Sequence, residues 1–424
     1  MTDLIERNLM PLARRMLEVF PVTVVQGARR VGKSTFAAQL AKGRDAVFYT
    51  LDDAEVREQA ETDARTLVQQ GGDGLLVIDE IQRSPQLLLA IKAAVDRDTR
   101  PGRFILTGSS DLLRLSQTPD SLAGRAVTLP LMGFSQGELA GIVDDFAGWI
   151  HEAGFYRSLS PMPSREDYAS ILLRGSYPEA VKLAPENRPA WLRSYVERLL
   201  RLDVVSLGRS LPATRLRAVL RLLAANQAGE LVYARLADQL GVSAPTVREN
   251  VELLETICLA TSIPAWSTNL TRRAVGRSKV IIQDSAMAAY LTGSTASKLL
   301  SVTAAPFFGE LLEGFVASEL LKQQAWTSRP FELFHYRDSS GLEVDLVMEF
   351  DDGSVFLIEV KASQTYRSEF FAPMKKLAQR IGPRCLGGVV FGTSNISFQH
   401  TDRFWGLPIA RLWSRSVIST PLDS

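Results

Sequence analysis

The chain has 424 residues, of which 46% are hydrophobic and 22% are charged, and its formal net charge is +1. A chain of this length divides into about two to four domains, and its composition excludes a largely disordered protein. The near-neutral balance excludes a polyanion-binding tail as the whole basis of function, so any contact with nucleic acid must come from local basic patches.

The cysteines and the N-terminus indicate the cellular compartment. Cys258 and Cys385 are the two cysteines, and both lie in apolar stretches, which argues against a disulfide framework and favours a reducing interior. The N-terminus lacks the basic-then-apolar order of a signal peptide, and no segment approaches the roughly 18 apolar residues of a membrane span. We therefore expect a cytoplasmic protein without membrane contact. The three dispersed histidines argue against a structural zinc site.

The first part of the chain alternates apolar strands with helices. A short amphipathic helix is expected within 8–20, and buried strands are predicted at 22–26, 46–53, 74–82 and 103–110. Continuous apolar strands that alternate with helices predict a parallel sheet covered on both faces.

The segment after the first strand carries a phosphate-binding motif. Its sequence, GARRVGKS, fits the P-loop pattern G-x-x-x-x-G-K-[ST] at every fixed position, and a strand and a helix flank it. Backbone N–H groups of such a loop point at phosphate oxygens, and the positive end of the next helix supports them. Lys33 is expected to reach the β- and γ-phosphates of ATP, and Ser34 to ligate Mg²⁺. The predicted nucleotide-binding residues are Gly27, Ala28, Arg29, Arg30, Val31, Gly32, Lys33, Ser34 and Thr35.

A second motif follows at the end of the third strand. An apolar run delivers Asp79 and Glu80 to the carboxyl edge of the sheet, where open α/β sheets bind ligands. We expect Asp79 to hold Mg²⁺ through water and Glu80 to polarise the attacking water. The hydroxyls of residues 107–110 are candidates for sensing the γ-phosphate, with a strand cap as the alternative. Arg125 is a candidate for stabilising the transition state, in its own subunit or in a neighbour, with a plain surface arginine as the alternative.

Helices dominate the next region, and a helix-turn-helix pattern lies within it. Two helical segments flank the turn at 241–243 with the spacing of that motif. The residues expected to face its core are Tyr233, Leu236, Ala237, Leu240, Val247, Val251 and Leu254.

DNA is the partner that this module would contact. Arg248 and Asn250 are expected to point outward, where they would reach bases or phosphates. An acid-free segment follows, and its basic residues predict a wing over the phosphate backbone: Arg272, Arg273, Arg277 and Lys279. The alternative is a module that only connects domains, because three glutamates on the second helix would repel phosphate.

The C-terminal region switches back to strands that carry charged residues. Asp345 shares a strand face with Glu343, and Glu359 and Lys361 share a face of the following strand because they are two residues apart. An acidic helix that precedes both strands offers Glu313.

This order of residues resembles the PD-(D/E)XK restriction-endonuclease-like superfamily. The resemblance implies that Asp345 and Glu359 bind Mg²⁺ or Mn²⁺ with the help of Glu313. It further implies that Lys361 orients or activates water. Val344 stands where the name of the superfamily has proline. A degenerate domain that keeps the fold and the charges without cleavage is the alternative.

A second resemblance covers nearly the whole chain. The segments VVQGARRVGKST, LLVIDEIQ, FILTGSS and LAGRAVTLPLMGFSQGEL resemble a large group of bacterial and archaeal AAA-type ATPases, and LLRGSYPEA, YVERLLRLDVVSL and GLEVDLVMEF extend the resemblance. Members of that group also carry a C-terminal domain of uncharacterised function. The resemblance therefore implies ATP hydrolysis but names no biological process.

The predicted architecture has four parts: a P-loop AAA-type ATPase domain over 1–150, a helical region over 151–230, a winged helix-turn-helix over 231–295 and an α/β nuclease-like domain over 296–424. The leading hypothesis is an Mg²⁺-dependent ATP hydrolase that couples turnover to DNA binding or processing, with a metal-dependent nuclease domain. The rival hypothesis is a nucleotide-dependent regulatory switch whose C-terminal domain is a catalytically dead docking module. A homo-oligomeric ring or dimer is compatible with both.

Overall fold

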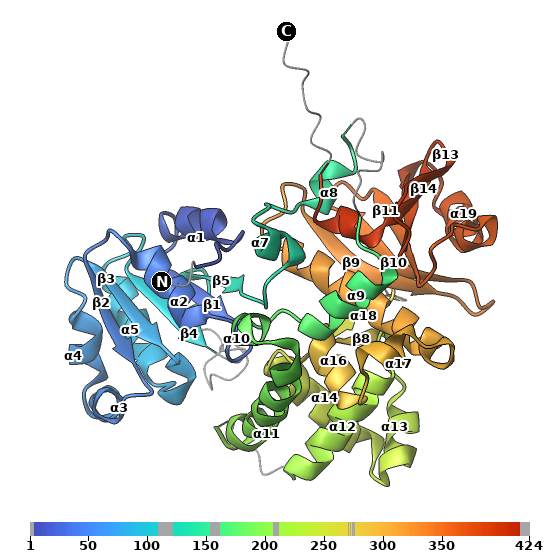
Figure 1. Cartoon of the computed structure of the whole chain (residues 1–424). Helices are drawn as coiled ribbons and strands as arrows, with labels where there is room; N and C mark the ends of the chain where they lie inside the picture. Colours follow the sequence, from blue (N-terminus) through green and yellow to red (C-terminus); the bar gives the residue numbers. More distant parts are fainter. Residues whose placement is uncertain are drawn as a thin grey trace.

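A five-stranded parallel sheet forms the first part of the molecule (Figure 1). We describe the computed structural model of the chain over residues 4–108, 122–152, 162–206, 212–269, 271, 273 and 276–415. The strands run in the order β2-β3-β4-β1-β5, and every neighbouring pair is parallel. Their bounds are β1 Val22–Gln26, β2 Ala46–Thr50, β3 Leu75–Asp79, β4 Phe104–Gly108 and β5 Ala126–Pro130. The helices of this part are α1 Met10–Leu17, α2 Lys33–Ala41, α3 Ala54–Thr62, α4 Ala64–Gln69 and α5 Leu87–Arg97.

Both faces of this sheet are buried, as the apolar strands predict. Leu75 and Val77 of β3 pack in one hydrophobic cluster, whereas Leu76 and Ile78 pack in another. Side chains of a strand alternate between its two faces, so each face has its own core. Because the strands are parallel, the carboxyl ends of β1, β3 and β4 meet at one edge, with β4 between the other two.

Helices and a small antiparallel sheet make up the middle of the chain. The helices are α7 Gln136–Ala140, α8 Phe146–Trp149, α9 Arg165–Arg174, α10 Pro178–Lys182, α11 Arg188–Ser206, α12 Ala213–Ala225, α13 Tyr233–Leu240, α14 Ala244–Thr256, α16 Ser285–Leu291 and α17 Ala296–Leu300. The sheet has the order β6-β8-β7 and consists of β6 Gly229–Glu230, β7 Ala260–Ile263 and β8 Lys279–Ile282.

The helix-turn-helix pattern corresponds to α13 and α14. Five of the residues predicted to face the core are buried and two, Tyr233 and Leu240, are half-buried. The expected outward position of Asn250 is wrong: its side chain is fully buried and its Nδ2 donates to the Thr246 carbonyl at 2.5 Å. Arg248 is exposed, and its guanidinium lies 4.7 Å from the centre of the Tyr233 ring. Of the two predicted base-contacting residues, Arg248 is therefore the one that lies on the surface.

A six-stranded mixed sheet forms the C-terminal part, with the order β13-β14-β12-β11-β10-β9. Helices α18 and α19 cover its opposite faces: Leu346 packs in the cluster that includes Leu312 of α18, and Val347 packs in the one that includes Leu377 of α19. The bounds are α18 Ala305–Gln323, β9 Phe331–Arg337, β10 Glu343–Phe350, β11 Val355–Lys361, α19 Ala372–Ile381, β12 Cys385–Gly392, β13 Phe398–Thr401 and β14 Phe404–Pro408.

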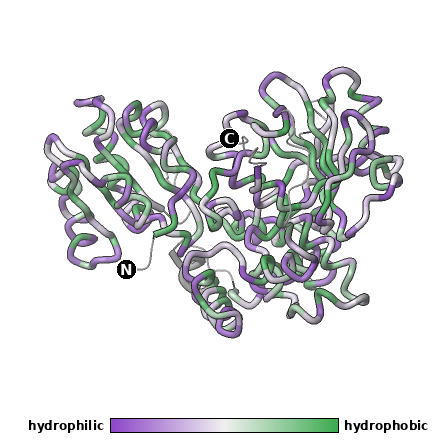
Figure 2. The backbone as a smooth tube through the Cα atoms, turned by 45° about the horizontal axis from the view of Figure 1, so that its top comes forward, coloured by the Kyte–Doolittle hydropathy of each residue, from purple (hydrophilic) through white to green (hydrophobic). Residues whose placement is uncertain are grey.

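One hydrophobic cluster runs through all three parts. It contains Phe36 of α2, Leu220 of α12, Leu312 of α18 and Ile358 of β11. Figure 2 shows apolar backbone segments concentrated in the two large sheets, with hydrophilic segments toward the periphery. Within the described residues, no helix has the length and apolar character that a membrane span needs.

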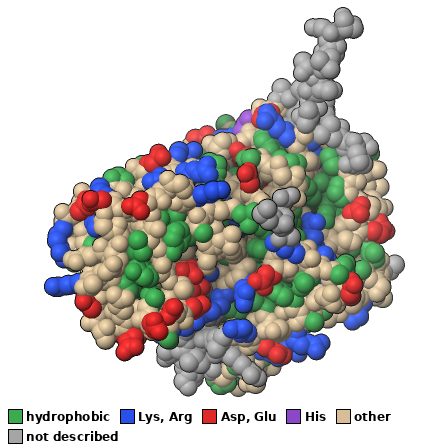
Figure 3. Space-filling model, turned by 60° about the vertical axis from the view of Figure 1, so that its left-hand side comes forward, with side chains coloured by type: hydrophobic (Ala, Val, Ile, Leu, Met, Phe, Trp, Pro, Cys, Tyr) green, Lys and Arg blue, Asp and Glu red, His purple; other side chains and the backbone are tan. Residues whose placement is uncertain are grey.

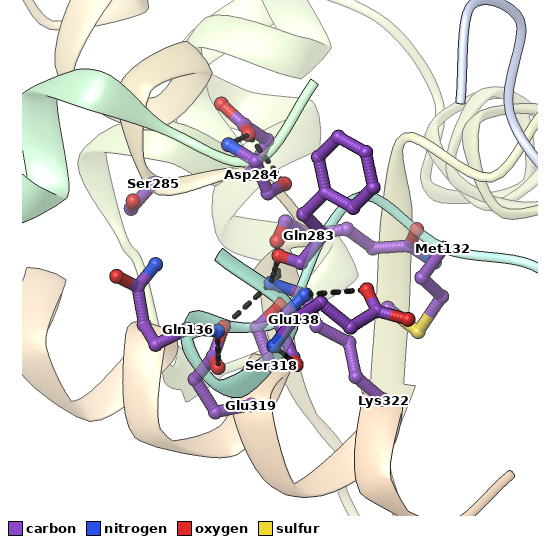
Figure 4. Close-up of polar contacts among 12 residues, drawn as sticks. Met132, Gln136, Glu138, Gln283, Asp284, Ser285, Ser318, Glu319 and Lys322 are labelled. Atoms are coloured by element: carbon purple, nitrogen blue, oxygen red, sulfur yellow. Dashed lines mark hydrogen bonds and ion pairs between the residues drawn. The ribbon is translucent and has the colours of Figure 1, made fainter. Parts of the chain in front are cut away.

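Buried polar contacts also join α18 to the segment that follows the first sheet (Figure 4). Glu319 accepts a hydrogen bond from the Gln136 backbone at 2.8 Å. Lys322 pairs with Glu319 at 2.6 Å and donates to the Phe134 carbonyl at 3.0 Å. The helix that carries Glu313 therefore also holds the end of the first part of the molecule.

Candidate functional site

The predicted P-loop turns sharply from β1 into α2. Gly32 caps α2 with a φ of 95°, a left-handed conformation that glycine adopts without strain, and Arg30 has a φ of 65°. A Cβ atom on Gly27 would lie 1.9 Å from the Leu131 carbonyl oxygen, so only glycine fits there. Both fixed glycines of the motif are thus required by the backbone itself.

Lys33, Ser34 and Asp79 meet at the carboxyl edge of the sheet. The Ser34 hydroxyl lies 2.9 Å from each carboxylate oxygen of Asp79. Lys33 is buried, and its Nζ donates to the Ala28 carbonyl at 3.0 Å, within the loop itself. Burial lowers the pKa of Lys33, and the nearby carboxylates of Glu80 and Asp79 oppose that shift. Hydroxyl and carboxylate oxygens are ligands that suit Mg²⁺, so these residues fit the metal that the motif implies.

Thr107 connects the second motif to the strand between the two motifs. Its buried hydroxyl donates to an Asp79 carboxylate oxygen, and it accepts a hydrogen bond from the Glu80 backbone at 3.1 Å. Glu80 has a φ of 59° and its side chain accepts from the Gln82 amide. The Thr107 hydroxyl is therefore occupied in orienting Asp79. Residues 109 and 110, the other predicted phosphate sensors, lie outside the described residues.

A cavity of about 690 Å³ opens beside these residues. Of the nine predicted nucleotide-binding residues, the structure places six on its wall: Arg29, Arg30, Gly32, Lys33, Ser34 and Thr35. Gly27, Ala28 and Val31 shape the loop from behind, and Ala28 and Val31 are buried in the core. Asp79 and Glu80 also line the cavity.

Helices α10 and α11 supply residues to this cavity that the sequence did not identify. Lys182 and Arg198 line it and are exposed. Tyr195 donates through its hydroxyl to the Arg29 carbonyl at 2.7 Å, and Glu179 pairs with Arg30 at 2.8 Å. No spacing pattern links these positions to the P-loop, so only the packing of the helices reveals them.

Arg125 lies at the opposite edge of the sheet from the P-loop. It directly precedes β5, and its carbonyl accepts from the Val22 backbone at the start of β1. A five-residue strand is about 17 Å long, which separates Arg125 from the phosphate-binding edge. Its guanidinium pairs with Asp96 at 2.6 Å. Of the alternatives for Arg125, this position favours a role in a neighbouring subunit or a plain surface arginine over a role in its own subunit.

The C-terminal charged residues do converge. Lys361 Nζ lies 2.6 Å from Glu359 and 3.4 Å from Asp345, so the residues predicted on adjacent strands form one cluster. Asp345, Glu359, Lys361 and Glu343 line a second cavity, of about 500 Å³. Lys376 and Arg380 of α19 add positive charge to its wall.

Burial and mutual charge shift the pKa values of this cluster. Burial acts to raise the pKa of Asp345, but Lys361 and Lys279 outweigh it and hold that pKa below its usual value. Burial, followed by repulsion from Asp345, raises the pKa of Glu359. Burial acts to lower the pKa of Lys361, yet Asp345 and Glu359 together raise it. Of the two carboxylates beside Lys361, Glu359 is therefore the one that holds a proton more readily.

Glu313 does not join Asp345 and Glu359 on the cavity wall. Its carboxylate accepts from Lys279 Nζ at 2.7 Å. In the described part of the chain, no three His, Cys, Asp or Glu side chains are arranged as ligands of one metal ion. The prediction that Glu313 helps Asp345 and Glu359 to bind the metal therefore does not fit this arrangement. Asp345 and Glu359 are the pair of carboxylates that remains for a metal at the cavity.

The predicted DNA-binding wing packs against the C-terminal sheet instead. Arg273 forms a two-pronged ion pair with Glu349 of β10 and is largely buried. Lys279 is buried among the carboxylates of the cluster. The prediction that Arg273 and Lys279 contact phosphate is therefore wrong. Arg277 is exposed, and Arg272 lies outside the described residues.

Three family models match separate parts of the chain. Residues 19–140 match a AAA domain, residues 165–298 a domain of unknown function (DUF8612) and residues 308–412 another (DUF4143). Uncharacterized proteins of Mycobacterium bovis and Mycobacterium tuberculosis are each 27% identical over 353 residues, which cover 83% of this chain and 73% of theirs.

Solved structures also show likeness to the chain. A Walker-type ATPase of Pyrococcus abyssi has a TM-score of 0.44 at 16% identity and covers 68% of this chain and 96% of its own. AMPPCP-bound DnaA from Aquifex aeolicus has a TM-score of 0.28 at 12% identity and covers 58% and 86%. The family match and the P-loop geometry together identify residues 19–140 as an AAA-type P-loop ATPase domain.

Proposed function

We propose that the chain is an Mg²⁺-dependent ATP hydrolase. The observation that carries the proposal is the 2.9 Å contact of the Ser34 hydroxyl with both oxygens of Asp79, on the wall of a cavity that Lys33 and Glu80 also line. Ser34 and Asp79 would hold Mg²⁺, which when bound neutralises phosphate charge and polarises the phosphoryl oxygens.

The residues of the chain have separate tasks in this reaction. Lys33 exchanges its hydrogen bond to the Ala28 carbonyl for bonds to phosphate oxygens, which a buried ammonium group makes strongly. Glu80 accepts the proton of the attacking water, and Thr107 keeps Asp79 oriented. Lys182 and Arg198 approach the phosphates from the helical wall of the cavity.

The experiment compares ATP binding and turnover in two variants. Glu80→Gln should bind ATP normally but turn it over about 100-fold more slowly, because a carboxamide cannot accept the proton of water. Glu58→Gln is the matched control, since Glu58 is exposed on α3 and outside the cavity wall. Turnover near the wild-type rate in Glu80→Gln would remove Glu80 from the reaction.

A route exists for coupling ATP to the rest of the molecule. Tyr195 holds the Arg29 carbonyl and Glu179 holds the Arg30 side chain, so α10 and α11 contact the loop that must rearrange around phosphate. The C-cap of α9, Gly175, is followed by Ser176, which donates to Asp284 at 2.7 Å at the start of α16. These contacts support a nucleotide-dependent switch that reaches α16 and its neighbour α18.

A second candidate activity is metal-dependent cleavage of phosphodiesters. It is favoured by the convergence of Asp345, Glu359 and Lys361 on a cavity whose wall also carries Lys376 and Arg380. The two carboxylates would hold one Mg²⁺ or Mn²⁺, which when bound lowers the pKa of water. Lys361 would balance charge gained by the phosphate, and the α19 cations would bind the backbone of the nucleic acid.

DNA is the proposed substrate class, with α13 and α14 as a winged-helix contact. The support is the antiparallel sheet β6-β8-β7 beside these helices and the exposed Arg248 and Arg277. Figure 3 shows acidic and basic side chains intermixed over the visible face rather than one continuous basic surface. Binding should therefore be modest and should weaken with added salt.

An assay with Mg²⁺ or Mn²⁺ on single-stranded, duplex and branched DNA tests the second activity. Cleavage should disappear in Asp345→Asn and Glu359→Gln, while ATP turnover persists because these residues lie outside the ATP cavity. If the wild type cleaves none of these substrates, the C-terminal domain is the docking module of the rival hypothesis.

A further inference from the structure

A buried lysine from the middle of the chain enters the C-terminal carboxylate cluster. Lys279 stands at the start of β8, and its side chain is 3% exposed. Its Nζ lies 2.7 Å from Glu313, 3.0 Å from Glu343 and 4.0 Å from Asp345. Three carboxylates thus lie within 4.0 Å of one buried ammonium group.

We propose that Lys279 is a positioning residue of the candidate cleavage site and takes the place of a second cation in it. Lys279 pairs with Glu313 and shares Glu343 with Arg337, and this leaves Asp345 and Glu359 to hold a single divalent ion. The inference rests on the second activity proposed above. It assigns Glu313 to Lys279 rather than to the metal.

The two lysines of the cluster differ in how they are held. Lys361 lines the cavity and its side chain is 33% exposed, so an incoming cation can displace it from the carboxylates. Lys279 and Glu313 are not among the residues that line the cavity, within the described part of the chain. A buried ammonium group that donates to Glu313 and lies beside Glu343 and Asp345 has no solvent to move into, so Lys279 stays where it is.

Contacts of the segment that precedes Lys279 anchor it to the C-terminal sheet. The Trp266 backbone donates to the His335 carbonyl at 2.6 Å, and the His335 backbone donates to the Pro264 carbonyl at 3.0 Å. The His335 ring contacts the Arg277 carbonyl at 2.8 Å. The cluster is therefore composite, with one member delivered by the β7–β8 hairpin.

Counting bound Mn²⁺ on the full chain, without nucleotide, tests this inference. The site is defined as the Mn²⁺ that the wild type binds and Asp345→Asn does not, which separates it from weak binding elsewhere. The wild type should bind one such ion per chain. Lys279→Met should bind one more, because Glu313 loses Lys279 and Glu343 keeps only Arg337. Lys279→Arg should again bind one. Lys298→Met, at an exposed lysine of α17, is the control.

A second variant decides the question even if Lys279→Met does not fold. Glu313→Gln should keep the Asp345-dependent Mn²⁺ with an affinity within about threefold of wild type, since Glu313 is not a ligand in this arrangement. Loss of that ion in Glu313→Gln would overturn the inference, as would an unchanged count in folded Lys279→Met. A wild type with no Asp345-dependent Mn²⁺ would overturn the inference and the cleavage activity together, while leaving the ATPase untouched.

Discussion

The ATP cavity and the C-terminal cluster both gather charges at a sheet, but they treat those charges differently. Around the ATP cavity, the one hydrogen bond of Lys33 to a described residue goes to a carbonyl of its own loop, and Lys182 and Arg198 are exposed. In the C-terminal cluster, Lys279 and Lys361 are each already paired with carboxylates. The first site is arranged to receive a charged ligand, whereas the second has to give up internal contacts before it binds one.

Desolvation explains why this difference matters. An open site leaves its charges partly hydrated, so a ligand replaces water and the cost is small. A buried, paired cluster has already been stabilised by its own ion pairs, and removing one partner leaves an uncompensated buried charge. We therefore expect variants at the ATP cavity to change ligand binding, and variants at buried clusters to change folding stability as well.

The largest expected effect concerns a third charged group, the buried network beside α18. Arg7 pairs with Glu138 at 3.0 Å and Lys322 with Glu319 at 2.6 Å, which leaves Asp144 as a third carboxylate. Among the described residues, its side-chain contacts are hydrogen bonds from neutral groups, such as Asn8 at 2.7 Å. Burial, followed by repulsion from Glu319, raises the pKa of Asp144 to about 7.

Stability should therefore fall as the pH rises. The folded protein keeps a proton on Asp144 that the unfolded chain loses near pH 4, so the stabilisation is complete below that pH and is lost as the pH rises through about 7. The total is on the order of 4 kcal/mol. Urea unfolding between pH 4 and 8 should show a shallower decline in Asp144→Asn than in wild type. Asp351→Asn, in an exposed turn, is the control, and parallel curves for all three proteins would contradict the assignment.

Lys33→Ala should weaken ATP binding by about 100-fold or more, which corresponds to roughly 2.7 kcal/mol. The reason is that Lys33 is the buried cation of the phosphate-binding loop. Calorimetric titration measures the effect, and Lys42→Ala, at the exposed end of the same helix, is the matched control. Lys361→Ala should leave ATP affinity unchanged. An ATP affinity within threefold of wild type in Lys33→Ala would break the contrast between the two sites.

The sequence could predict those parts of the two sites that depend on local geometry. The P-loop and the strand that ends at Asp79 are contiguous segments, and the parallel sheet brings them to one edge, so the pattern alone placed Ser34 beside Asp79. Glu359 and Lys361 were predictable for the same reason, because a strand puts them on one face. These residues needed only local geometry.

The rest depends on packing between distant segments. Lys279 reaches Glu313 across 34 positions of sequence, and no local pattern distinguishes a lysine that will be buried from one that contacts phosphate. Asn250 follows two outward positions on α14, yet a hydrogen bond to Thr246 satisfies it inside the core. Tyr195 and Arg198 reach the ATP cavity only because α11 lies against the P-loop.

Arg273→Met should destabilise the protein by about 2 kcal/mol, since it removes one partner of a largely buried ion pair. Arg273 also lies over the Phe334 ring at 5.0 Å and the Trp266 ring at 5.4 Å, contacts that methionine replaces in part. The free energy of unfolding in urea measures the loss. Arg277→Met, at an exposed position, should change stability by less than about 0.5 kcal/mol.

For DNA binding we expect the reverse order of effects: a larger one at Arg277 than at Arg273. If the module contacts phosphates, Arg277→Met should reduce the salt dependence of binding and Arg273→Met should not, beyond its effect on folding. An Arg273→Met variant that is as stable as wild type but has lost DNA affinity would show that this segment leaves the C-terminal sheet to bind DNA.

The smallest expected effect is that of Arg125→Ala. Arg125 is at the edge of the sheet away from the P-loop and is paired with Asp96 on a partly exposed surface. Such a pair contributes about 0.5 kcal/mol to stability, and the geometry gives Arg125 no access to the phosphates of its own chain. Turnover at low protein concentration should thus stay within about twofold of wild type. Arg97→Ala, at an exposed position of α5, is the control. Arg103→Ala is a poorer control because that side chain is more buried.

Repeating the assay over rising protein concentration tests the role in a neighbouring subunit. If the specific activity of wild type climbs with concentration while that of Arg125→Ala stays flat, an assembly must bring this edge of one sheet to the P-loop of the next. Coinciding curves for the two proteins would leave Arg125 as a surface arginine.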